Sequence, residues 1–177
     1  MERTIILFGK ITEENCKEVC QKIIEINEHD QEEEDRLKEY ERKPIKLYID
    51  SYGGECYASL SVVSAIKTSK TPVYTFCNGY AMSAAALIFI SGSKRFITEN
   101  TTIMFHQMLC GEPIKTLLDL QEDIEEFKVL QKMLIDIVLK NTKITSAQLN
   151  KYYDKKKDWY LHKADILKYK VADEVVI

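Results

Sequence analysis

Apolar positions repeat along the chain with two different periods, which predicts alternating strands and helices. Several short apolar runs are typical of buried strands, and the first three are each followed by a segment with helical spacing. The runs lie at 4–8, 45–49, 73–77, 95–97 and 102–106. The first helix is expected to begin after Thr12 as its N-cap, the next at 57–68, and another near Ser83. Repeated units of this kind predict an α/β fold with a largely parallel sheet.

Two longer segments depart from this alternation. Residues 28–43 are nearly all polar, which indicates a solvated helix end and loop. Residues 117–139 place apolar side chains at steps of three and four, so the longest helix is expected there. Its acidic residues precede its lysines, which suits the helix dipole. This helix should bury one face in the core or against another subunit. The pattern of residues 164–177 predicts a short helix and a last strand.

Composition narrows the class of protein. A chain of 177 residues suits one domain with a sizeable core, and 45% hydrophobic with 30% charged residues is typical of globular proteins. The net charge of −3 gives no reason to expect nucleic acid. The first apolar run is too short for a signal peptide, and 81–90 is far below the roughly 20 residues that span a bilayer. We therefore expect a cytoplasmic protein without a membrane anchor.

Five cysteines without a CxxC pair favour reduced thiols rather than a disulfide framework. Cys16 and Cys20, four residues apart on the expected first helix, could share a metal ion, but no other candidate ligands lie near them. We expect neither a metal nor a cofactor.

Glycines mark the places where chemistry is expected. The stretches "IDSYGGECYASL" and "CNGYAMSAAAL" each join an expected parallel strand to a helix, at the sheet edge where ligands bind in α/β proteins. Gly53 and Gly54 leave backbone N–H groups unobstructed, as an oxyanion hole requires, although a tight turn with no other role explains them equally well. Neither stretch has the glycine spacing of a nucleotide-binding loop.

Ser83 and His106 are the candidates for nucleophilic catalysis. Ser83 follows the second glycine stretch at an expected helix start, where a serine is otherwise a helix cap. His106 ends an apolar strand at the same sheet edge and could act as its general base, the alternative being a hydrogen-bonded core histidine. His29 and His162 lie in surface or packing contexts. A carboxylate should orient the imidazole, and composition alone leaves four candidates. They are Asp154, Asp158, Asp165 and Asp173.

Four motifs in this order resemble the proteolytic subunit of the Clp protease family, and the resemblance covers almost the whole chain. The motifs are "LYIDSYGG", "GYAMSAAALI", "TIMFHQ" and "DWYLHKADILKYKVADEVV". The family patterns that they match are Asn-Ser-Pro-Gly-Gly, Gly-x-Ala-x-Ser, Met-x-His-Gln and an Asp-Arg-Phe-like stretch. Four ordered motifs are far more specific than any one of them.

The resemblance implies roles for particular residues. Ser83 would be the nucleophile, His106 the base and Asp158, just before "WYL", the orienting carboxylate. The backbone N–H groups of Gly54 and Ala84 would form the oxyanion hole. The implied function is a serine endopeptidase subunit of a Clp-type protease that hydrolyses unfolded polypeptides. The protease subunit of this family binds no nucleotide, which agrees with the missing P-loop.

The resemblance also implies a fold and an assembly. The fold would be a Clp- and crotonase-like ββα superhelix in one peptidase domain, 1–177, with a protruding handle at about 108–140. Seven subunits would form a ring, two rings would enclose a chamber, and the apolar stripe of the handle would be buried between them. The partners implied are further copies of the chain, as a heptamer or tetradecamer, and a AAA+ unfoldase or a second Clp-type subunit.

Several positions depart from the family pattern. On this resemblance, we expect the chain to begin at the family's first core strand and to lack the preceding segment whose axial loops contact the unfoldase. Tyr52 replaces the proline of the Pro-Gly-Gly motif, and Asp50 replaces an asparagine, adding a negative charge close to the active turn. The Gly-x-x-Gly that begins the family's handle is missing after His106. These changes favour a divergent member, such as a phage-encoded, plastid-like or accessory paralogue.

Two other functions fit parts of the pattern. A catalytically weak or inactive ring-forming partner subunit would explain the changes at Asp50 and Tyr52, although the Ser, His and Asp set is complete. An acyl-CoA hydratase or isomerase of the crotonase fold would use a similar glycine-turn oxyanion hole. Such enzymes place glutamates where this chain has Ser83 and its neighbours.

Overall fold

A computed structural model describes residues 1–109 and 116–176. The strands are β1 (Thr4–Ile11), β2 (Ile45–Gly54), β3 (Val73–Cys77), β4 (Tyr80–Met82), β5 (Lys94–Ile97), β6 (Thr102–Phe105), β7 (Trp159–Leu161) and β8 (Glu174–Val175). The helices are α1 (Glu13–Arg36), α2 (Cys56–Thr68), α3 (Ala84–Ile90), α4 (Leu117–Asn141), α5 (Ser146–Tyr153) and α6 (Lys163–Lys168). Strands and helices alternate over most of the chain, which confirms the expected α/β fold.

The strands form one sheet in which β2 connects two parts. The strand order is β7-β6-β4-β2-β3-β5-β8, and β1 pairs with β2. Strand β2 pairs with β1 along most of its length, with β3 through its first residues, and with β4 only at Ser51, near its other end. All pairings in the sheet are parallel except that of β6 with β7. The long strand therefore reaches past β3 to the segment that contains Ser83.

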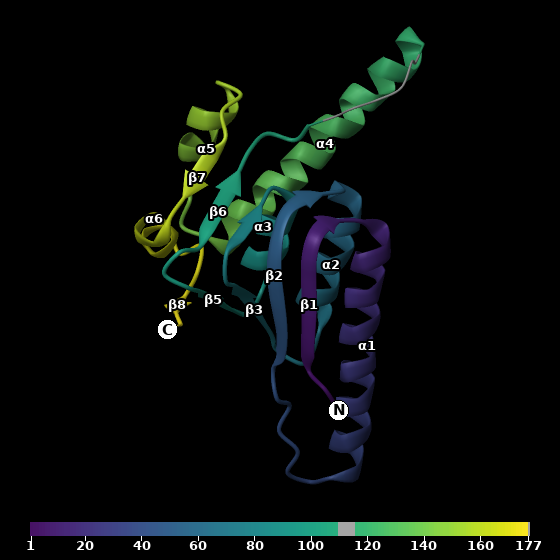
Figure 1. The fold of residues 1–177 in the computed structure, drawn as a ribbon. Helices are drawn as coiled ribbons and strands as arrows, with labels where there is room; N and C mark the ends of the chain where they lie inside the picture. Colours follow the sequence, from purple (N-terminus) through teal and green to yellow (C-terminus); the bar gives the residue numbers. More distant parts are fainter. Residues whose placement is uncertain (110–115, 177) are drawn as a thin grey trace.

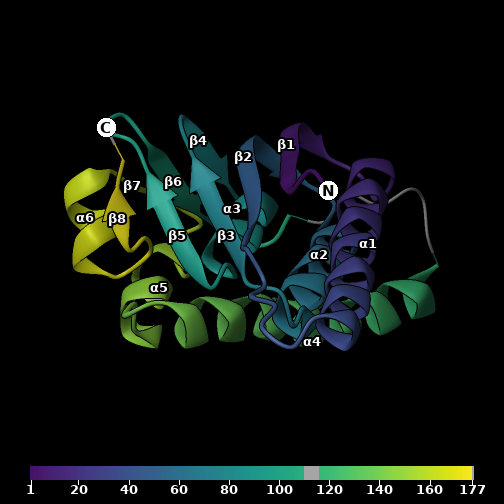
Figure 2. The ribbon, with the colours of Figure 1, turned by 90° about the horizontal axis from the view of Figure 1, so that it is seen from below.

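Helices α1, α2 and α3 lie against one face of the sheet and enclose the core with it (Figures 1 and 2). Every residue of α3 is buried, so its unbroken apolar sequence is that of an internal helix. On the other face, the rings of Tyr48, Phe76 and Phe96 stack in a row, with centroids 4.8 and 4.6 Å apart. The expected strands are confirmed, several of them longer than the apolar runs, whereas β4, β7 and α5 were not predicted.

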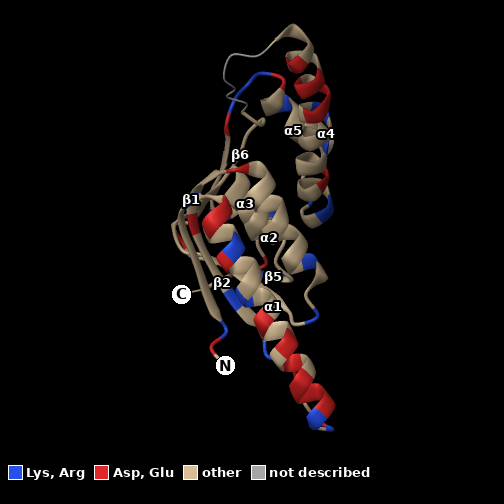
Figure 3. Cartoon of the chain, turned by 90° about the vertical axis from the view of Figure 1, so that its right-hand side faces the viewer, with Lys and Arg blue, Asp and Glu red and all other residues tan. Residues whose placement is uncertain are grey.

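The polar segment 28–43 is more structured than its composition indicates. Helix α1 continues to Arg36, and Figure 3 shows acidic residues concentrated along its end. Asp30 is fully buried, because its carboxylate accepts hydrogen bonds from Arg3, from Thr71 at 2.6 Å and from Tyr40 at 2.6 Å. Burial opposes ionisation of Asp30, but these donors outweigh it and hold the pKa of the carboxyl well below its usual range. The buried carboxylate of Asp30 thus joins this segment to Arg3, just before β1, and to Thr71, just before β3.

Helix α4 is the longest helix, as predicted, and it projects from the body of the molecule (Figure 1). Its start is stabilised by a capping box between Thr116 and Asp119. The second half buries Leu130, Leu134 and Val138. Six apolar side chains elsewhere along the helix are exposed instead. They are Leu117, Leu118, Leu120, Ile124, Val129 and Met133. The handle was expected at about 108–140, and its residues 110–115 lie outside the described residues.

Among the described residues, none of the helices combines the length and the apolar character that crossing a membrane requires.

Candidate active site

Ser83 lies between β4 and α3 in an unusual backbone conformation, with φ of 55° and ψ of −125°. Positive φ is strained for a residue with a side chain, at a cost of about 1–3 kcal/mol. The Ser83 N–H donates to the carbonyl of Met104 at 2.9 Å, and its carbonyl accepts from Ala86 at 3.0 Å. The residue occupies the N-cap position of α3, but its side chain makes no capping hydrogen bond. Ser83 therefore holds the expected cap position, but its hydroxyl does not cap the helix and is available for another partner.

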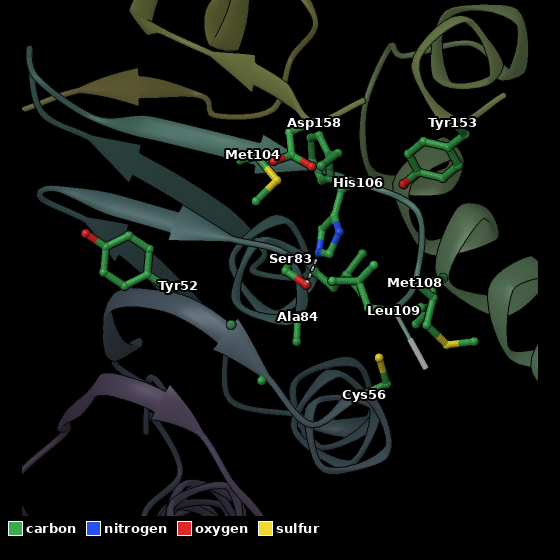
Figure 4. A pocket seen from close by; sticks show the side chains of 15 residues that line it. Tyr52, Cys56, Ser83, Ala84, Met104, His106, Met108, Leu109, Tyr153 and Asp158 are labelled. Atoms are coloured by element: carbon green, nitrogen blue, oxygen red, sulfur yellow. Dashed lines mark hydrogen bonds between the residues drawn. The ribbon is translucent and has the colours of Figure 1, made fainter. Parts of the chain in front are cut away.

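That partner is His106, which directly follows β6. Its Nε2 lies 2.6 Å from the Ser83 hydroxyl oxygen (Figure 4). Burial lowers the pKa of the imidazole below its usual 6.5, and the charge of Asp158 offsets part of this effect. The lowered pKa favours the neutral ring, and Nε2 accepts the hydroxyl proton when Nδ1 carries the ring hydrogen. His106 thus has Ser83 as its hydrogen-bond partner, in the geometry that a general base requires.

Asp158 lies just before β7 and lines the same cavity as Ser83 and His106. Its carboxylate is exposed and accepts a hydrogen bond from the Tyr160 hydroxyl at 3.4 Å. Within the described part of the chain no hydrogen bond joins Asp158 to His106, although the charge of Asp158 is close enough to raise the pKa of the ring. The structure thus brings together the serine and the histidine, and holds the aspartate nearby.

The other candidates lie elsewhere. Asp173 is bound by Arg95, whose guanidinium donates to it at 2.8 and 2.9 Å. Asp154 is the C-cap residue that follows α5, Asp165 lies in the first turn of α6, and neither lines the cavity. The ring of His162 contacts Thr102 at 3.3 Å rather than the site. Of the four aspartates that composition left open, Asp158 is the one that lines the cavity.

The two glycines end strand β2 instead of forming a turn beyond it, which corrects the expectation of a loop. A Cβ atom on Gly53, whose φ is +99°, would lie 2.8 Å from the Ser83 Cβ and 2.7 Å from the Met82 carbonyl oxygen. A Cβ atom on Gly54 would lie 2.1 Å from the carbonyl oxygen of Ile11 in β1. No side chain fits at either position. Gly54 and Ala84, expected to supply the oxyanion hole, both line the cavity.

A cavity of about 430 Å³ adjoins the Ser83 hydroxyl. Its wall is mostly apolar, and Figure 4 shows side chains from α2, the segment after β6, and α5 around it. The larger apolar side chains of the wall are those of Leu87, Met104, Phe105, Met108, Leu109 and Leu134. The Met108 N–H donates to the side-chain oxygen of Gln131 at 2.8 Å, which ties the segment after His106 to α4. Gln131 and the cavity residue Tyr153 were not predicted, because no local motif in the sequence marks either of them.

The two positions that depart from the family pattern have separate roles. One carboxylate oxygen of Asp50 accepts the N–H groups of Gly79 at 2.8 Å and Tyr80 at 3.0 Å. The negative charge of Asp50 thus stabilises the turn before β4 by accepting these two backbone N–H groups. Tyr52 is 70% exposed, lies at the rim of the cavity and packs its ring 4.3 Å from that of Tyr80 (Figure 4).

Comparisons with known proteins agree with the motifs and with the fold. The Clp protease family matches residues 1–177. The ATP-dependent Clp protease proteolytic subunit of Deinococcus radiodurans is 34% identical over 134 residues, which are 75% of this chain and 64% of that protein. The chain belongs to the Clp protease family. The match therefore spans a little under two thirds of that relative's length.

The close approach of β2 to Ser83 predicts an unequal response to two glycine substitutions. Gly53→Ala and Gly9→Ala both place a side chain at positive φ, but a Cβ on Gly9 meets nothing within 4 Å. We expect Gly9→Ala to lower the free energy of unfolding by about 1–2 kcal/mol. Gly53→Ala should cost about 1–3 kcal/mol more, because Ser83 must move. Urea denaturation checks this, and equal losses would contradict the close approach.

Proposed function

We propose that this protein is a serine endopeptidase subunit of a Clp-type protease and that it hydrolyses peptide bonds in unfolded polypeptides. The observation that carries the proposal is the 2.6 Å contact between the Ser83 hydroxyl and His106 Nε2 at the edge of an open cavity. Membership of the Clp protease family supports the reaction class. The strained backbone at Ser83 adds support, because such strain is common at functional sites.

The proposed reaction is acyl transfer in two stages. The Ser83 oxygen attacks the peptide carbonyl while its proton passes to His106 Nε2. The N–H groups of Gly54 and Ala84 stabilise the negative charge that develops on the carbonyl oxygen. His106 then gives the proton to the leaving amine as the C–N bond breaks. Water, deprotonated by His106, attacks the acyl-enzyme ester, and Ser83 is regenerated when its oxygen takes the proton back.

Asp158 is proposed as the carboxylate that accepts the His106 Nδ1–H. That role stabilises the imidazolium formed during attack and selects the tautomer that leaves Nε2 free. In the single chain the carboxylate is exposed and bonded to Tyr160, so engagement requires a rotation of the Asp158 side chain. The same observation favours a second candidate function, a subunit that forms the ring without catalysing. Reactivity of Ser83 distinguishes the two.

The proposed assembly is a ring of seven copies, alone or stacked as a tetradecamer, that encloses the sites. Its support is α4, which projects from the body and exposes six large apolar side chains. Isolated soluble chains rarely expose such a stripe, whereas subunit interfaces use it. A AAA+ unfoldase, or a second Clp-type subunit, is the proposed partner. No cofactor or metal takes part in the proposed reaction.

Reaction with a fluorophosphonate probe tests the nucleophile. The wild-type protein should be labelled once, at Ser83, because Nε2 of His106 activates that hydroxyl. Ser83→Ala should abolish labelling, while the control Ser64→Ala, which changes an exposed serine of α2, should leave it intact. Mass spectrometry of the labelled peptide measures both. A wild-type protein that does not react would contradict the peptidase function and favour the inactive partner subunit.

The labelling rate should also depend on pH and on Asp158. Only neutral His106 acts as base, so the rate should fall as pH decreases through a pKa below 6.5. Asp158→Asn should slow labelling by at least about 100-fold. It should also move the acid limb to lower pH, since a charge that raises the pKa of His106 is removed. Asp154→Asn, in the same loop but outside the cavity, is the control and should change neither.

Light scattering tests the role of α4 in assembly. The wild-type protein should have the mass of at least a heptamer at micromolar concentration. The double substitution Leu120→Asp and Ile124→Asp should reduce that mass, because two exposed apolar side chains become charged. Gln121→Asp adds a charge on the same helix without removing apolar surface, and should preserve the particle. A wild-type monomer would contradict the proposed chamber.

A further inference from the structure

The pairing of β6 with β7 brings Asp158 and His106 to opposite positions. In this antiparallel pair the last opposed residues are Phe105 and Trp159. One step farther along the register come His106, which follows the first of these, and Asp158, which precedes the second. Directly opposed residues of an antiparallel pair have Cβ atoms about 4.5–5.5 Å apart. Rotation of the Asp158 side chain, without a shift of the strand, can therefore bring its carboxylate to the imidazole.

The Asp158 carboxylate is bonded to Tyr160 instead. Side chains alternate between the two faces of a strand, so Asp158 and Tyr160, two residues apart, lie on the same face. The Tyr160 hydroxyl donates to Asp158 Oδ2 at 3.4 Å, whereas no hydrogen bond joins Asp158 to His106 within the described residues. Tyr160 is 49% exposed. Because the bond is long and partly solvated, its loss should have a small effect, but one of definite sign.

The hydroxyl is the part of Tyr160 that the Clp pattern lacks. Where that pattern has Asp-Arg-Phe, this chain has Asp-Trp-Tyr at residues 158–160. Phenylalanine would keep the aromatic ring opposite Met104 and remove only the donor to Asp158. The substitution Tyr160→Phe therefore isolates the hydrogen bond from the packing of the ring.

We propose that Tyr160 is a positioning residue that restrains Asp158 from engaging His106. This inference rests on the proposed peptidase function and deepens it, because it names a residue that limits the reactivity of Ser83. In the described structure Tyr160 does not line the cavity beside Ser83, so it acts through the carboxylate rather than on the substrate. While Tyr160 holds Asp158, the Nδ1–H of His106 lacks its acceptor, and the imidazolium formed during attack is less stabilised.

A double-mutant cycle of Tyr160→Phe and Asp158→Ala tests the proposal on the full chain. The measurement is the rate at which fluorophosphonate labels Ser83 at pH 8. Tyr160→Phe should raise this rate about threefold, the effect of one exposed hydrogen bond that no longer competes for the carboxylate. In the Asp158→Ala background the same substitution should change the rate by less than about 1.5-fold, because no carboxylate remains to be released.

The matched control is Tyr57→Phe. Tyr57 is also exposed and also donates its hydroxyl to a carboxylate, that of Glu126 at 2.6 Å, but it does not line the cavity. Its substitution removes the same kind of bond at a distance from Asp158. The labelling rate should therefore equal that of the wild type.

The pH profile separates this role from a merely structural one. A released carboxylate lies closer to the His106 ring and favours its charged form, so Tyr160→Phe should raise the pKa of His106 and move the acid limb to higher pH. Besides Asp158, the titratable side chains that line the described cavities at His106 are Tyr52, Cys56, Tyr153 and Lys156. The substitution changes none of them. A loss of packing alone would leave the acid limb in place.

The outcomes separate this inference from the peptidase function. Slower labelling of Tyr160→Phe would show that the hydroxyl supports Asp158 in its catalytic position, and would overturn the proposal. An unchanged rate, or an equal rise in both backgrounds, would overturn it as well and leave the peptidase function intact. Labelling of Tyr160→Phe when the wild type does not react would support the restraint. If neither protein reacts, the peptidase function and this inference both fail.

Discussion

The arrangement of the site depends on the contact between the end of β2 and the backbone at Ser83. Gly53 lies so near Ser83 and Met82 that a single methyl group would overlap both. On its other side, Gly54 is pressed against Ile11 of β1. The last two residues of β2 therefore fill a gap that is only as wide as a backbone. This contact sets the position of the cavity edge relative to Ser83, and it requires glycine twice in succession.

The pairing of β4 with β6 sets the position of His106 relative to Ser83. Met82 is paired with Met104, and the next N–H along the chain, that of Ser83, donates to the Met104 carbonyl. Ser83 therefore lies one residue after Met82, and His106 lies two residues after Met104, at the ends of two neighbouring parallel strands. A shift of one residue in this register would turn the imidazole to the other face of the sheet. The 2.6 Å contact between the two side chains is thus a consequence of strand pairing.

The parts of the site that are less constrained lie farther from the sheet. Tyr153 is the last residue of α5, and Asp158 lies between α5 and β7. Gln131 reaches the segment after His106 from α4. Helix α4 exposes apolar side chains where it projects from the body, and the Asp158 carboxylate is exposed as well. On the proposed ring assembly, neighbouring subunits would cover these surfaces. Assembly and alignment of the aspartate would then be coupled, because both involve the least buried part of the molecule.

Local sequence determined much of this protein. Apolar periodicity was sufficient for the main strands and for α4, and the order of four motifs was sufficient for the family and for the pairing of Ser83 with His106. The short strands β4 and β7 were missed because three residues carry no periodic signal. Only the tertiary structure showed that Asp30 is buried, that Asp50 holds the turn at Gly79, and that Tyr153 faces the cavity. The partners of Asp30 and Asp50 are at least ten residues away in the sequence, so only the packing of the chain brings them together.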